Sequence, residues 1–162
     1  MLRRAAIIAF SLLPMAAGAG CSQPVDLKQA LEVTDLQSGW FDAGVVDGKN
    51  KIVPSATFRL RKKADVELRP VALNIVFKNA DGSDSTFEDI FIARVPFNDQ
   101  GTTDPLTARS KNGYTADPPQ TRADMLKNSQ FRDVAIQIFA KQSSAQWVEL
   151  QRVVIERQIL TQ

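Results

Sequence analysis

The 162-residue sequence has no histidine and a single cysteine, Cys21. Without histidine, a Ser/His/Asp triad, a Cys/His dyad and a histidine-based zinc site are excluded. One cysteine also excludes a CxxC redox pair and any disulfide within the chain. We therefore expect no catalytic residues, no metal site and no cofactor, although carboxylate and lysine chemistry remain open.

An excess of one charge is also missing. The chain has 20 basic and 18 acidic residues. Two of the basic residues, Arg3 and Arg4, lie in a segment that we expect to be removed, which leaves 18 of each sign. A neutral protein lacks the long-range attraction that draws basic proteins to polyanions, so we expect no nucleic-acid partner.

Residues 1–20 have the three parts of a secretory signal peptide. Arg3 and Arg4 precede an apolar run over residues 5–13, and small residues follow Pro14. The apolar run is roughly nine residues long, far below the ~20 that a membrane-spanning helix needs. The pattern predicts an export signal that is cleaved from the mature chain.

The end of this segment resembles a bacterial lipobox. The tract Gly18-Ala19-Gly20-Cys21 would make Cys21 the lipid-modified first residue of the mature protein. Acylation would also consume a thiol that is a liability in an oxidising compartment. Ser22, rather than Asp, follows the cysteine, which resembles an outer-membrane address. We expect a lipid-anchored protein of the bacterial envelope that faces the periplasm, at the outer rather than the inner membrane. An ordinary cleavage site beside a free cysteine is the alternative.

Alternation of apolar and polar residues with a period of two dominates the rest of the chain, which is typical of strands with one buried face. Asp81-Gly82 predicts a hairpin turn, since it adopts positive φ at little cost. An even-to-odd shift of the apolar positions predicts a β-bulge over residues 151–153. We predict strands over residues 31–36, 56–60, 71–77, 86–95, 106–110, 131–140 and 147–160.

One short helix is expected over residues 122–128, with Thr121 as its N-cap and Asp124 at the positive end of its dipole. About seven strands and one connecting helix predict an all-β protein, an Ig-like two-layer antiparallel β-sandwich. We assign residues 31–162 to this domain and residues 21–30 to a lipidated tether. A closed barrel is the alternative architecture.

The lipobox, together with a strand that ends Phe77-Lys78-Asn79-Ala80-Asp81-Gly82, resembles the small bacterial envelope lipoproteins that carry one Ig-like domain of the FxLYD kind. What this resemblance implies is an architecture and a location, because members of such families mostly have no assigned function.

Three aromatic residues are candidates for an interaction site. Trp40 and Phe41 lie in a glycine-flanked segment, residues 38–44, that we interpret as a loop. They would form either an exposed recognition anchor or a plug in one end of the sandwich. Tyr114, in the long irregular stretch 98–119, would either contact a partner or donate its hydroxyl to a backbone carbonyl.

Charged residues give weaker candidates. Arg59, Arg61, Lys62 and Lys63 would either touch anionic headgroups or form a solvated strand face. Glu88 and Asp89 point to opposite faces of a strand and cannot flank one scissile bond. Asp81, Asp84 and Glu88 match no calcium-loop spacing and are interpreted as a polar turn.

These features together predict a membrane-anchored, non-enzymatic binding or adaptor module for another envelope protein. A carrier of an apolar ligand between the two sheets is the alternative.

Overall fold

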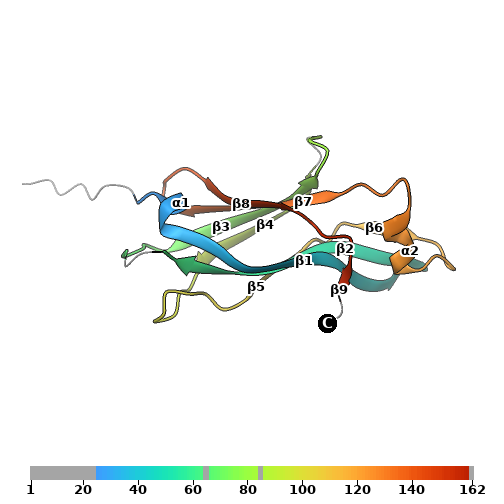
Figure 1. Cartoon of the computed structure of the whole chain (residues 1–162), viewed down its shortest axis with the longest axis horizontal. Coiled ribbons are helices and arrows are strands. Elements are labelled where there is room, and N and C mark those ends of the chain that lie inside the picture. Colours follow the sequence, from blue (N-terminus) through green and yellow to red (C-terminus); the bar gives the residue numbers. More distant parts are fainter. Residues whose placement is uncertain (1–24, 64–65, 84–85, 161–162) are drawn as a thin grey trace, which may run out of the picture.

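Two β-sheets packed face to face form the body of the protein (Figure 1). The computed structural model describes residues 25–63, 66–83 and 86–160. The predicted signal peptide and Cys21 lie outside the described residues. The expected two-layer β-sandwich is confirmed, with nine strands in the described part rather than about seven.

The first sheet contains the longest strands. β1 and β2 form an antiparallel hairpin, and the short β9 adds to β1 in parallel. β5 and β6 both pair with the other edge of β2. The strands of this sheet are β1 (Leu31–Val46), β2 (Lys49–Lys62), β5 (Leu106–Arg109), β6 (Tyr114–Ala116) and β9 (Ile159–Leu160).

The second sheet is fully antiparallel, in the order β4-β3-β7-β8. The hairpin expected at Asp81-Gly82 joins β3 to β4. Strands β1, β2 and β5 thus lie in one sheet, and β3 pairs with the β7–β8 hairpin in the other. The same division of strands is found in an Ig-like sandwich. The strands of this sheet are β3 (Val71–Asn79), β4 (Thr86–Val95), β7 (Val134–Gln142) and β8 (Val148–Val154).

The core lies between the two sheets. The predicted alternation is confirmed in β2, where Ala56, Phe58 and Leu60 are fully buried. Side chains of Leu73 and Ile138 are equally buried in the second sheet. Side chains of both sheets thus meet in one core between them.

The loop predicted over residues 38–44 is wrong, because β1 continues through it to Val46. The register of β1 against β2 shifts between Thr34 and Gln37 and again between Asp42 and Val45. Asp35, at φ 52°, lies in the first of these bulges, and Gly44, at φ 79°, lies in the second. Each bulge breaks the period of two, and the strand signal therefore stops at residue 36.

The folded body begins earlier than expected. α1 (Leu27–Ala30) buries Leu27 and Ala30, so the end of the predicted tether 21–30 belongs to the sandwich. The helix predicted over 122–128 is confirmed as α2 (Arg122–Lys127), with Thr121 as its N-cap.

Two expectations for the second sheet are wrong. We expected burial on both faces of residues 86–95, but Phe91 is 61% exposed, because it points to the outer face of the second sheet, which no further layer of the described structure covers. The predicted strand 147–160 is two strands, β8 and β9. Its bulge falls at Leu150, between Glu149 and Gln151, one residue before the predicted range.

Gly113 marks a close approach of β6 to β2. A Cβ atom there would overlap the backbone carbonyl of Ile52. Gly113→Ala should therefore displace β6 and lower the free energy of unfolding by about 2 kcal/mol or more, measured by chemical denaturation. Gly48→Ala is the control: its φ is 77°, but its Cβ would meet nothing within 4 Å, so only about 1 kcal/mol is expected. Equal losses in the two variants would contradict the predicted clash.

Candidate binding site at one end of the sandwich

The end of the sandwich opposite α1 gathers β6, α2 and the turn between β1 and β2 (Figure 1). We call it the distal end. An aromatic cluster lies there: ring centroids are 5.6 Å apart for Trp40 and Tyr114, and 4.7 Å apart for Phe131 and each of these two rings. These separations are typical of favourable aromatic pairs.

The structure brings together Trp40 and Tyr114 but not Phe41. Trp40 is 0% exposed, so it plugs this end of the sandwich and is not an exposed recognition anchor. Phe41 follows it in β1 and points to the opposite face. There its ring lies under the guanidinium of Arg109, whose central carbon is 3.3 Å from the ring centroid.

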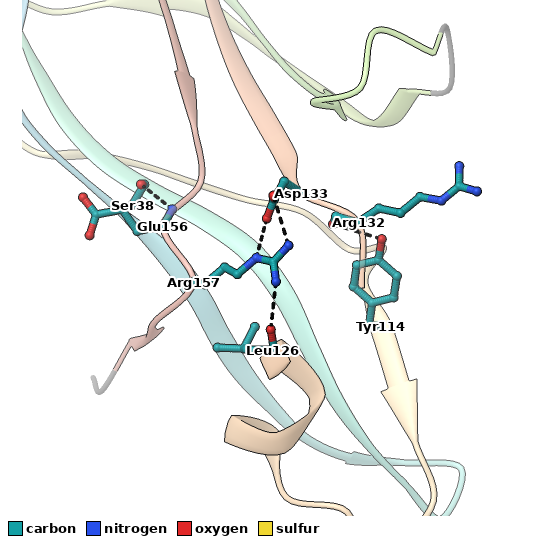
Figure 2. A network of polar contacts seen from close by, with 7 residues as sticks. All are labelled: Ser38, Tyr114, Leu126, Arg132, Asp133, Glu156 and Arg157. Atoms are coloured by element: carbon teal, nitrogen blue, oxygen red, sulfur yellow. Dashed lines mark hydrogen bonds and ion pairs between the residues drawn. The ribbon is translucent and has the colours of Figure 1, made fainter. Parts of the chain in front are cut away.

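Tyr114 is half-buried, and its hydroxyl donates a hydrogen bond to the backbone carbonyl of Arg132, 3.2 Å away (Figure 2). Of the two roles expected for Tyr114, this is the hydrogen bond from its hydroxyl to a backbone carbonyl. The bond fastens β6, at the edge of the first sheet, to the segment that leads into β7.

A capping box holds α2 in place. The Thr121 hydroxyl accepts from the backbone N–H of Asp124 at 3.2 Å, and the Asp124 carboxylate accepts from the backbone N–H of Thr121 at 3.3 Å. The Thr121 hydroxyl, and then its backbone N–H, hold the pKa of Asp124 below its ordinary value. Arg122 ties the helix to β1 through Asp42, with Nε and Oδ1 3.0 Å apart.

Arg157 fastens the C-terminal segment to the same end (Figure 2). Its Nε and Nη2 donate to the two carboxylate oxygens of Asp133 at 2.6 and 3.1 Å, and Nη1 donates to the Leu126 carbonyl at 3.3 Å. The hydrogen bond to Asp133 raises the pKa of Arg157. Nearby, the Ser38 hydroxyl accepts from the backbone N–H of Glu156 at 3.2 Å.

A pocket of about 200 Å³ opens between β6 and α2. It is smaller than the ~300 Å³ at which small-molecule sites begin, and its size suits a single side chain of another protein. Apolar rings and amide side chains line it together. The lining residues are Tyr114, Thr115, Ala116, Gln120, Met125, Asn128, Gln130 and Phe131.

Two exposed valines lie beside this pocket. Val45 is 63% and Val46 39% exposed at the turn between β1 and β2. Val45 pairs with Asn50 of β2, which pairs with Ala116 of β6 in the pocket wall. Val45 therefore lies two strands from the pocket, about 10 Å away. The sequence did not predict either valine as a site residue, because the bulge at Gly44 interrupts the alternation that indicates a strand.

The basic residues expected on β2 have partners of their own. Arg61 donates to Glu32 at 2.8 Å and thereby lowers the pKa of Glu32. Arg59 donates to the Thr103 carbonyl at 2.8 Å, and Lys63 donates to the Lys28 carbonyl at 3.2 Å. This pattern agrees with a solvated strand face rather than a headgroup site.

The acidic candidates give no metal site in the part of the chain that the structure describes. No group of three or more possible ligands occurs there. Asp84 lies outside the described residues, and Glu88 accepts from the backbone N–H of Lys111 at 3.2 Å.

No protein-family model matches this chain, and no curated protein matches it. The resemblance to FxLYD-like lipoproteins stays a prediction.

Trp40→Ala should lower the free energy of unfolding by about 3–5 kcal/mol, because it removes a fully buried ring from the aromatic cluster. Denaturant titration followed by circular dichroism would measure the loss. Trp147→Ala is the control, since Trp147 is 36% exposed and its removal should cost clearly less, about 1–2 kcal/mol. A small loss at Trp40 would contradict its assignment to the core.

Proposed function

We propose that the protein is a lipid-anchored, non-enzymatic binding module of the bacterial cell envelope. Cys21 would hold it to a membrane, preferably the outer membrane, and the distal end would engage another envelope protein. The observation that carries this proposal is the pair of exposed valines beside a pocket of side-chain size, at the end of the sandwich remote from Val25.

The anchor is inferred from residues 1–21. Acyl chains contribute about 0.8 kcal/mol per buried methylene, so two or more chains hold a protein to a bilayer stably. Both described helices are too short to cross a membrane. The chain enters the sandwich at α1, and β1 runs from there to the distal end over 16 residues. At about 3.3 Å per residue, the distal end would lie ~50 Å from the anchored end.

The distal end has the chemistry of a protein-binding surface. A small number of side chains in well-packed pockets, often aromatic ones, supply most of the energy in such interfaces, and polar groups surround them. Here the pocket would take one apolar side chain of the partner, with Gln120 and Asn128 available for hydrogen bonds and Val45 covered by the partner's surface.

Cys21→Ser should abolish membrane attachment, since the acylated atom is the cysteine sulfur. In a detergent phase separation the wild-type mature protein is expected in the detergent phase and the variant in the aqueous phase. Ser22→Ala, which keeps the sulfur, is the control and should partition like the wild type. A wild-type protein that stays in the aqueous phase would show that the anchor is absent.

A photoreactive aromatic residue placed at Val45, or at the exposed Asp117 that follows the pocket residue Ala116, should give a covalent adduct of the same size in intact cells. The same residue at Phe91, which is more than half exposed on the other sheet, is the control and should give none. Val45→Asp should reduce the adduct yield at Asp117 about tenfold, since burial of a valine side chain contributes about 1.5 kcal/mol. Adducts from Phe91 alone would place the interface elsewhere.

A further inference from the structure

The opposite end of the sandwich carries α1, the loop over residues 66–70 and the turn between β7 and β8 (Figure 1). We call it the anchor end. An open cleft of about 760 Å³ lies there, lined by Val25, Leu68, Pro70 and the turn residues Ser143–Gln146 among others. The first described residue and the β7–β8 turn therefore lie at one place on the surface.

Trp147 follows this turn directly and remains 36% exposed. The ammonium nitrogen of Lys141 lies 4.6 Å from the centre of its ring, and the ring of Phe91 meets it edge to face at 6.2 Å. Tryptophan is enriched at the level of lipid headgroups, where its apolar ring and polar N–H both find suitable surroundings. A lysine beside it can direct its charge toward water while its methylenes cover apolar surface.

The length of the preceding chain limits where this end can lie. Three residues lie between Cys21 and Val25, and the four steps of extended chain from one to the other span at most about 14 Å. An acylated Cys21 would thus hold Val25, which lines the cleft, within about 14 Å of the bilayer surface, so this end of the sandwich would face the lipid.

We infer that the anchor end rests on the lipid surface, with Trp147 inserted among the headgroups. This inference depends on the proposed acylation of Cys21. The cleft lining holds one charge of each sign, Glu67 and Arg69, so we assign the contact with lipid to the Trp147 ring rather than to charge. The contact is therefore an apolar one, and it needs no anionic lipid.

The two tryptophans make the contact measurable, because Trp40 is buried in the core and Trp147 is exposed. The mature lipidated protein is reconstituted into phosphatidylcholine vesicles whose acyl chains are brominated near the headgroup, and its indole emission is compared with that in unbrominated vesicles. Bromine quenches only indoles in contact with the bilayer. The emission of Trp147 alone is the wild-type emission minus that of Trp147→Phe, both measured in unbrominated vesicles. Bromination is expected to remove this part of the wild-type emission.

Two control variants make the test specific. Trp147→Phe should show no quenching, since only Trp40 remains. Val46→Trp combined with Trp147→Phe restores an exposed indole at the distal end and should also show none. Wild-type protein that enters the vesicles but is not quenched overturns the orientation and leaves the anchor intact. Protein that does not associate with vesicles overturns both.

Discussion

The packing of Trp40 against Tyr114 and Phe131 closes the distal end of the sandwich, and the arrangement of that end depends on it. Burial of a tryptophan ring removes about 150–250 Å² from water, worth roughly 4–6 kcal/mol. The indole N–H finds no partner among the described residues, which costs about 1–3 kcal/mol. Burial of the ring therefore outweighs the unsatisfied donor, and the cluster can position β6 without a disulfide.

The C-terminal segment joins the two sheets across this cluster. After β8 the chain leaves the second sheet, and the Trp40 backbone N–H donates to the Gln158 carbonyl at 2.8 Å. The guanidinium of Arg157 bonds both the turn before β7, at Asp133, and the end of α2, at Leu126. The pocket itself is lined by one stretch of the chain, within residues 114–131, and Arg157 fastens that stretch to the C-terminal segment. This rigidity suits a surface that must receive a side chain without reorganising.

The sequence predicted the parts of this fold that follow from a regular period. Strands β2, β3 and β7 were found because their inward positions alternate, and α2 was found because Thr121 and Asp124 form its cap. The second half of β1 was missed because two bulges interrupt the alternation, and Phe91 was misplaced because edge and central strands have the same local pattern. No local signal links Arg157 to Asp133, whose side chains meet only in the folded chain, or Val45 to Ala116, which both pair with Asn50.

The course of β1 has a mechanical consequence. It begins at the anchor end, beside α1, and its last residues, Val45 and Val46, form part of the distal surface. A pull between a membrane-held lipid and a partner bound at the tip would act on both ends of this one strand. The tension would pass along covalent backbone, and the ladder to β2 would be loaded in shear over its whole length rather than unzipped one hydrogen bond at a time.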